Sequence, residues 1–441
     1  MSLGLLLCGA GAALLADFSG SYLVPLDHKA IQYATAPATD RVSQLVRRIK
    51  AGEVKLTYNP EHGYLESLLS ELKVPVSSQV LVFSKTSFQA PKIGPRTPRA
   101  LYHSDDVSVG YVIGGDVLEI VCVDPVLGAL FYTLDQEKTA IPQIERRGDC
   151  LQCHAGNATI GVPGWIVRSM YVERSGMPIF NAPSFITDHR SPMKDRWGGW
   201  YVTGKHGTQT HMGNVFVEDK TNPQLDRTAG SNLTDLSSRV DTGPYAGHGS
   251  DIVSLMVLEH QTRMINLLTR VGYEIRMALN DQRPMNELDG ASPDNMRPST
   301  ERRINNAVEE MLKYMLFVDE ATLDAPVEGS AAYAKDFQSA GPRDKRGRSL
   351  RELDLKKRMF RYPLSYYVYS PAFDALPQPG RDRFYRRLWE IVSGADKSAD
   401  YARLTTADRA AIREILLETK KGLPSYWVQS NQAANALLKS S

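Results

Sequence analysis

Residues 109–134, VGYVIGGDVLEIVCVDPVLGALFYTL, contain three runs of β-branched and aromatic residues in quick succession. The runs cover residues 109–113, 117–123 and 129–134, and Gly or Pro lies between them, which is the pattern of short strands. The step Gly114-Gly115-Asp116 between the first two runs indicates a hairpin turn. We therefore expect an antiparallel sheet here, with a further strand upstream in residues 79–83.

A second stretch, residues 146–154, RRGDCLQCH, contains Cys150, Cys153 and His154 in the pattern C-x-x-C-H. Two thiols at this spacing can add to the two vinyl groups of a haem, and the adjoining histidine then lies under the iron as an axial ligand. With 4 Cys and 9 His in 441 residues, chance is a poor explanation of the pattern. In these five residues the chain resembles the c-type cytochromes, which implies one covalently attached haem c per chain.

Two other chemistries use paired cysteines. A structural zinc site needs four ligands at local spacing, and no second Cys or His pair follows the motif nearby. A thioredoxin-type redox pair opens a helix after a strand and does not need His154. Haem attachment is the interpretation that uses all three residues of the motif.

The composition, with 42% hydrophobic and 23% charged residues, is typical of a soluble protein of two or three domains. Residues 3–16 form an apolar run with small residues towards its end, and we interpret residues 1–20 as a signal peptide. The run is short for a membrane span, so we expect at most peripheral membrane association. A net charge of +2 makes no case for nucleic-acid binding. Export to the periplasm, or otherwise out of the cytoplasm, agrees with the assembly of c-type haem outside the cytoplasm.

The remaining patterns predict an α+β fold, in which an antiparallel-sheet haem-binding module precedes a mainly helical domain. We expect an N-terminal helical segment at 21–74, the haem-binding domain at 75–220, a linker at 221–249 and the helical domain at 250–441. By analogy alone, the sheet module is of the size of a PAS-like or Cache-like sensor.

Within these boundaries, apolar residues at helical spacing predict short helices at 40–53 and 63–72. Strand signals resume after the motif at 165–172, 178–187, 198–203 and 214–217, with a turn at 173–176 between the first two. Ser250 or Asp251 can cap a long helix that reaches residue 279, and Ser299 or Thr300 can cap another. Thr406 can cap a helix at 407–417.

The motif supplies one axial ligand and leaves the sixth iron position open. His206 and His211 are the leading candidates for it, and Met212, His189 and His260 are the others. Each candidate histidine also has an ordinary interpretation, as a turn residue, a surface residue or a hydrogen-bonded core residue.

Two tryptophans and an arginine precede the leading candidates. Trp197 and Trp200 lie beside a Gly pair and suit the wall of a flat macrocycle, and Arg196 could pair with its propionates. The same residues would also suit a bent strand in a sheet.

Residues 341–361 carry nine Arg and Lys against three acidic residues. Such a face could dock an acidic redox partner through weak, salt-dependent contacts, and a solvated helix face is the alternative. We find no sequence motif of a nucleotide-binding loop, a nucleophile elbow or a zinc protease.

The sequence therefore predicts an exported monohaem c-type cytochrome that transfers one electron with a redox partner. A haem enzyme or a haem-based sensor that uses an open or weakly held sixth iron site is the alternative, so the sequence leaves catalysis undecided.

Overall fold

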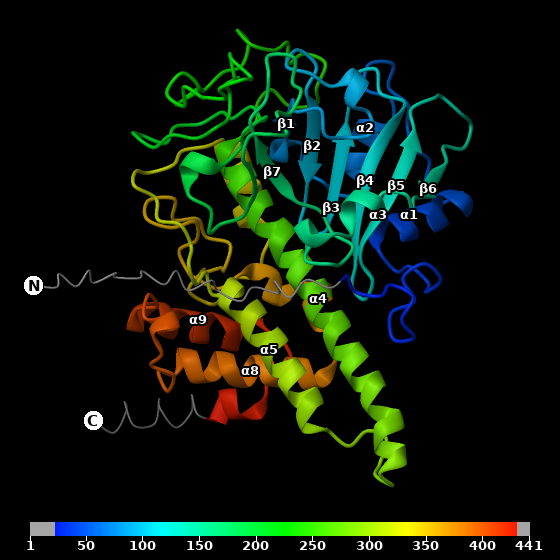
Figure 1. Ribbon diagram of the computed structural model, residues 1–441, viewed down its shortest axis with the longest axis vertical. Helices are drawn as coiled ribbons and strands as arrows, with labels where there is room; N and C mark the ends of the chain where they lie inside the picture. The colour runs from blue at the N-terminus through cyan, green and yellow to red at the C-terminus, as the bar shows by residue number, and fades with distance from the viewer. Residues whose placement is uncertain (1–22, 430–441) are drawn as a thin grey trace, which may run out of the picture.

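The computed structural model describes residues 23–429, so the predicted signal peptide lies outside the described residues. In these residues all strands precede the long helix α4 (Ile252–Leu288), and the larger helices follow it. Figure 1 shows the sheet at one end of the molecule, α4 running diagonally away from it, and the later helices packed at the other end. The predicted α+β class, an antiparallel sheet with a helical region, is confirmed at this level.

The main sheet is a six-stranded antiparallel meander in which each strand pairs with its neighbours in sequence. The β3–β4 hairpin turns at Gly114, whose φ of 64° confirms the predicted turn. The sequence patterns did not identify β2 and β6. The strands are β1 (Val80–Val82), β2 (Arg99–His103), β3 (Val107–Tyr111), β4 (Val117–Asp124), β5 (Gly128–Asp135) and β6 (Ile144–Arg146).

Alternate residues of β5 face two different cores. Ala129 and Phe131 pack into the core that contains α4, whereas Leu130 and Tyr132 pack into the core that contains α1 (Arg41–Lys50) and α2 (Leu65–Glu71). Both faces of the sheet are therefore covered, which explains why β5 is buried along nearly its whole length.

After the motif, only part of the predicted strand structure forms. β7 (Val167–Met170) and β8 (Ser184–Thr187) pair as a separate two-stranded sheet, so the prediction of one sheet continuing through the motif was wrong. The turn at 173–176 does form, with the Gly176 amide donating to the Glu173 carbonyl. The predicted strands at 198–203 and 214–217 were also wrong. Trp197 and Gly199 adopt φ of 67° and 87° at the first segment, and Asn214 adopts φ of 68° at the second, and these angles interrupt the extended chain.

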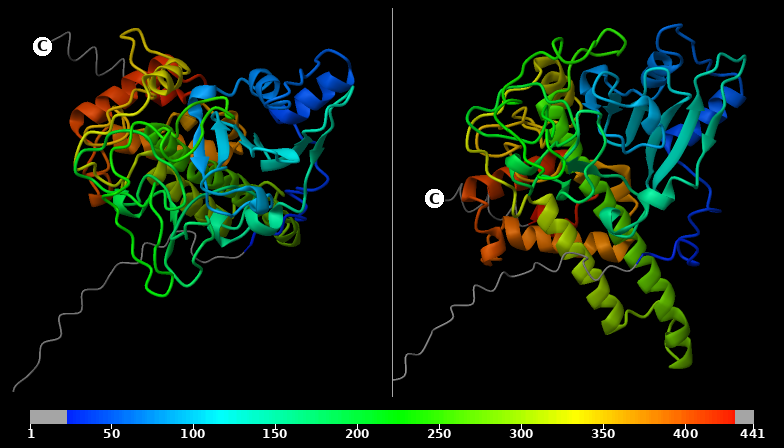
Figure 2. Two further views of the ribbon diagram at one scale, coloured as in Figure 1. Left: turned by 90° about the horizontal axis from the view of Figure 1, so that it is seen from above. Right: turned by 45° about the horizontal axis from the view of Figure 1, so that its top comes forward.

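Residues 196–251 contain neither a helix nor a strand. This agrees with the irregular structure predicted for residues 221–249, but the segment packs on the sheet. The Tyr245 hydroxyl donates to the Pro98 carbonyl at 2.8 Å, and Leu236 and Val240 are buried in the same core as the strands. Both views of Figure 2 show these green loops beside the sheet. The division of the chain into domains at these positions stays a prediction.

Helix α4 begins as predicted, because the Asp251 carboxylate accepts the Ser254 amide at 2.8 Å, but it continues through Pro284 to residue 288. Helix α5 (Pro298–Met315) starts at a proline in its first turn, so Ser299 and Thr300 do not cap it. The remaining helices are α3 (Leu151–His154), α6 (Ala331–Ser339), α7 (Pro371–Asp374), α8 (Gln378–Val392) and α9 (Thr406–Thr419), with 3₁₀ turns η1 (Val76–Ser78), η2 (Ala90–Lys92), η3 (Asn157–Thr159), η4 (Met193–Asp195), η5 (Tyr366–Tyr369) and η6 (Ala399–Tyr401).

The cap of α9 lies one residue earlier than predicted. Thr405 and Asp408 form a capping box, in which each side chain accepts the other's backbone amide. Thr406 is therefore the first residue of the helix and does not cap it.

Candidate haem-attachment site

The C-x-x-C-H motif folds into a single helical turn at the end of β6. The Arg147 amide donates to the Phe131 carbonyl at 2.8 Å and completes the pairing with β5 before the chain turns away. The His154 amide then donates to the Cys150 carbonyl at 3.0 Å. Because residues three and four apart lie on one face of a helix, this turn places Cys153 and His154 beside Cys150.

The imidazole of His154 is oriented by a backbone carbonyl. Its Nδ1 lies 3.0 Å from the carbonyl oxygen of Gly164, and the Gly164 amide donates to the His154 carbonyl at 2.9 Å. A carbonyl can only accept, so Nδ1 carries the ring proton and the lone pair is on Nε2. This is the outer hydrogen bond that histidine ligands of metals commonly make.

The surroundings of the His154 ring keep it neutral. Burial lowers the pKa of His154 below its ordinary value, and the hydrogen bond to Gly164 opposes this only in part. The ring also lies against Phe131 of β5, with ring centroids 4.9 Å apart. A neutral imidazole is the form that can bind a metal ion.

Helix α4 braces the loop that holds His154. The Asn266 side-chain amide donates to the Trp165 carbonyl at 3.0 Å, and Arg270 donates to the Ile160 carbonyl at 3.1 Å. A Cβ atom at Gly164 would lie 2.0 Å from the Asn266 carboxamide oxygen. The loop can approach α4 this closely only because residue 164 has no side chain.

The two motif thiols are both free and differ in exposure. Cys153 is exposed, whereas Cys150 is half-buried against the core. Burial, followed by the nearby Asp149 carboxylate, raises the pKa of Cys150, so it remains a thiol at neutral pH. Cys122, the other cysteine among residues 23–429, is free and buried in β4.

These residues fit haem attachment in three respects: two free thiols on one helical turn, an adjoining imidazole with its lone pair on Nε2, and a braced loop. Within residues 23–429, no three His, Cys, Asp or Glu side chains are grouped to hold a metal ion.

The leading candidates for the sixth ligand, His206 and His211, lie together in the irregular region. Their ring centroids are 4.8 Å apart, and Trp197 lies edge-on to His211 at 5.4 Å. The Asn232 amide donates to Nε2 of His206 at 2.9 Å, and the Gly213 amide donates to Nδ1 of His211 at 3.0 Å.

In both of these hydrogen bonds the histidine ring accepts, whereas the ring of His154 donates. Because an amide can only donate, the accepting nitrogen must be unprotonated, so the proton is on Nδ1 of His206 and on Nε2 of His211. The nitrogens left for a metal therefore carry hydrogen and present no lone pair.

His189 and His260 form a second buried pair. Their Nδ1 atoms are 2.9 Å apart, and Nε2 of His260 lies 2.8 Å from the Ser365 hydroxyl. Tyr314 and Phe317 stack on both rings. Burial lowers the pKa of His260 to about 3 and holds that of His189 well below its ordinary value, so both rings form a neutral polar core.

Met212 is also buried, and its sulfur accepts from the Ser169 hydroxyl at 3.5 Å. In the described part of the chain, none of the five candidate sixth ligands makes a hydrogen bond or ring contact with His154. The identity of the sixth ligand stays a prediction.

The predicted haem-wall residues lie in the protein core. Trp197 and Trp200 are both buried, and the Trp200 indole donates to the Arg168 carbonyl at 2.8 Å. Arg196 forms a buried ion pair with Glu259 at 2.9 Å, and its other nitrogens donate to the carbonyls of Ser191 and His189. Its guanidinium is therefore already occupied by protein acceptors.

The basic stretch at 341–361 is largely neutralised by its surroundings. Its six arginines form ion pairs, among them Arg348 with Asp344 and Glu414, and Arg358 with Asp408. In the described residues, Lys356 and Lys357 make no ion pair and are exposed. The positive charge of residues 341–361 that is not paired with a carboxylate is therefore much smaller than the composition of the stretch indicates.

Sequence reasoning did not identify Gly164 and Asn266, which position the candidate ligand. The one available signal was the Pro163-Gly164 step ten residues after the motif, because glycine is required where two backbones approach closely. Asn266 gave no such signal, since a polar residue on a helix is usually exposed.

Comparison with models of protein families, with curated proteins and with solved structures finds no match to this chain. No helix in residues 23–429 combines the length and the apolar character that a membrane span requires.

Proposed function

We propose that this protein is an exported monohaem c-type cytochrome that transfers one electron at a time to or from a partner protein. The observation that carries the proposal is the hydrogen bond from His154 Nδ1 to the Gly164 carbonyl, which leaves the Nε2 lone pair available beside two free thiols. When bound, a haem supplies reversible one-electron chemistry at its iron.

In this proposal the chain has three tasks at the motif. Cys150 and Cys153 hold the cofactor covalently, one from a half-buried and one from an exposed position. His154 serves as the axial ligand, and its burial keeps the ring neutral. The contacts of α4 with the 160–165 loop fix the ring orientation.

The proposal is tested by producing the full chain together with haem-attachment machinery and staining the denatured protein for haem. We expect covalent haem in the wild type and none in the double variant Cys150→Ser with Cys153→Ser. Cys122→Ala is the matched control, because it removes a thiol outside the motif. A wild-type protein without covalent haem would overturn the proposal.

A second candidate function, a haem enzyme or haem-based sensor with an open sixth position, is favoured by one specific observation. The hydrogen bonds of His206 and His211 place protons on the nitrogens that would have to bind iron. Carbon monoxide added to the reduced protein separates the two functions. Rapid binding supports the open site, and no binding supports a six-coordinate electron carrier.

For an electron carrier, an acidic redox partner remains the proposed partner class. The ion pairs within residues 341–361 leave its exposed lysines as the charges free to attract such a partner. We expect Lys356→Gln with Lys357→Gln to lower the association rate at low salt, and Arg346→Gln, whose charge is already paired with Glu414, to lower it less.

A further inference from the structure

Basic side chains converge on a cavity of about 590 Å³ formed by loops beside the sheet. They come from segments far apart in the sequence, and no acidic residue is among the described residues that line the cavity. The basic residues are Lys85, Lys92, Arg96, Arg174 and Arg239.

Only two of these five charges have acidic partners. Lys92 pairs with Asp116 at 2.6 Å, and Arg174 makes two hydrogen bonds with Glu218, at 2.8 and 2.5 Å. Within residues 23–429, Lys85, Arg96 and Arg239 make no ion pair.

Arg239 is held in place by backbone oxygens alone. Its guanidinium donates to the carbonyl of Asn214 at 2.6 Å and to that of Ala229 at 3.4 Å. Carbonyl groups fix its position and leave its positive charge uncompensated. Three positive charges therefore remain around the cavity.

Backbone contacts hold two of the segments that line the cavity. Gly176, at φ 85°, accepts from the Lys85 amide at 2.9 Å, and a Cβ atom there would lie 2.6 Å from the Phe83 carbonyl oxygen. The Tyr201 hydroxyl donates to the Pro95 carbonyl at 2.7 Å and anchors the 94–97 turn. These contacts fix the backbone of two segments that line the cavity.

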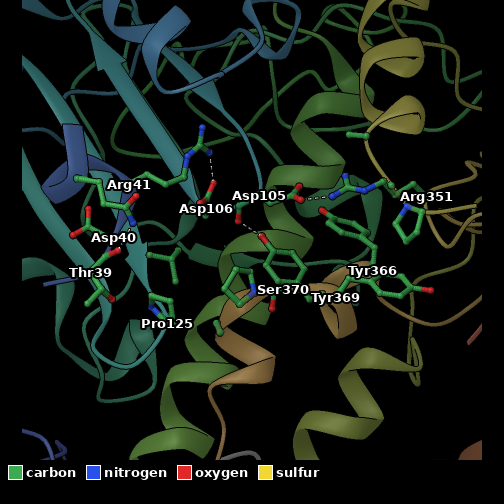
Figure 3. A pocket seen from close by; sticks show the side chains of 18 residues that line it. Thr39, Asp40, Arg41, Asp105, Asp106, Pro125, Arg351, Tyr366, Tyr369 and Ser370 are labelled. Carbon is green, nitrogen blue, oxygen red and sulfur yellow. Dashed lines mark hydrogen bonds and ion pairs between the residues drawn. The ribbon is translucent and has the colours of Figure 1, made fainter. Parts of the chain in front are cut away.

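A second cavity, of about 500 Å³, differs from the basic cavity because its arginines pair with carboxylates of its own wall. In Figure 3, the side chains of Arg41 and Asp106 point toward one another on one side, and those of Arg351 and Asp105 on the other. Each arginine there has its own carboxylate in the wall. The basic cavity lacks such partners.

We propose that the basic cavity binds a small multivalent oxyanion, such as a phosphate-bearing or polycarboxylate molecule. Oxyanions bridge several Arg and Lys groups through charge-assisted hydrogen bonds. The half-buried Lys85 and Arg239 are reached from inside the cavity, where a small molecule fits. An acidic protein surface would meet mainly the exposed Arg96 and Arg174.

Isothermal titration calorimetry on the full chain, at constant ionic strength, tests this site with pyrophosphate and with citrate as separate probes. We expect at least one probe to bind with a Kd below about 1 mM. Arg239→Gln and Lys85→Gln should each weaken that binding about tenfold or more, since each removes a charge-assisted contact. Lys357→Gln, an exposed lysine elsewhere, is the control and should leave the Kd unchanged.

Binding of one probe alone supports the site and assigns phosphate or carboxylate chemistry to its ligand. Arg239→Gln also removes hydrogen bonds to the backbone, so Lys85→Gln and Arg96→Gln keep the test decisive if that variant unfolds. The proposal is overturned if neither probe binds the wild type. It is also overturned if Lys357→Gln weakens binding as much as Lys85→Gln, because the attraction would then be nonspecific.

Discussion

His154 on the one hand, and His206 and His211 on the other, are buried or half-buried histidines whose rings have hydrogen-bond partners of opposite kind. His154 donates from Nδ1 to a carbonyl, whereas His206 and His211 accept from backbone amides. The first arrangement exposes a lone pair, and the second leaves an N–H group. Readiness to bind a metal is thus set by the hydrogen-bond partner of the ring, and residue type and sequence spacing do not reveal it.

The largest effect is expected from removing the imidazoles themselves. His154→Ala should abolish the optical spectrum of a histidine-ligated haem, because the axial ligand is lost. His206→Ala and His211→Ala should leave that spectrum unchanged if their free nitrogens carry protons. A change from a low-spin to a high-spin spectrum in either variant would identify that histidine as the sixth ligand. It would also contradict the assignment of a proton to its free nitrogen.

The next effect concerns Arg196, which was predicted to pair with haem propionates and is paired with buried Glu259. Arg196→Leu should lower the free energy of unfolding by about 3–5 kcal/mol, because it leaves a buried carboxylate without its partner. Urea denaturation measures this loss. Arg196→Leu combined with Glu259→Leu should recover much of the loss. A stable single variant with an altered haem spectrum would restore the propionate interpretation.

The protonation state of His211 can be tested through the pH dependence of the free energy of unfolding. Burial and the neighbouring His206 lower the pKa of His211 to about 3, from 6.5. A lowered histidine pKa means that unfolding takes up a proton below pH 6.5, so the stability contributed by the neutral ring is lost as pH falls from 6.5 towards 3.

His211→Asn keeps an acceptor for the Gly213 amide and removes the titrating ring. Between pH 6.5 and 4.5, the wild type should lose about 2–3 kcal/mol more than this variant in urea denaturation. Equal losses would show that His211 is already charged, or exposed, in the folded protein.

The smallest effect is expected at the brace of His154. Gly164→Ala should cost about 1–3 kcal/mol of unfolding free energy, because its Cβ would overlap Asn266, and it should reduce the haem content. Gly148→Ala is the control, since a Cβ there meets nothing within 4 Å. If both variants behave alike in thermal unfolding and haem content, α4 does not position the ligand loop.

The sheet was predictable from the sequence where strand propensity and turn residues alone determine the local structure. The run of apolar and aromatic residues at 129–134 and the glycine turn at 114 specify strands and a hairpin without help from the rest of the molecule. The start of α4 was equally local, because one aspartate caps it. After the motif, the fold depends on tertiary contacts, and residues with strand propensity at 198–203 are bent by positive φ angles.

The candidate site was predictable from the sequence only at the C-x-x-C-H motif. Cys150, Cys153 and His154 are adjacent in the sequence, so their proximity follows from one helical turn. The proton positions on His206 and His211 depend on the amides of Asn232 and Gly213, which only the folded loops bring to the rings. The five charges of the basic cavity come from segments spread over residues 85–239, and no local pattern joins them.

The most direct test is the intact mass of the purified full chain, produced with haem-attachment machinery, with the site of modification mapped by peptide analysis. The account predicts the addition of one haem, located on the peptide that contains Cys150 and Cys153. An unmodified chain, or a haem lost on denaturation, would contradict it.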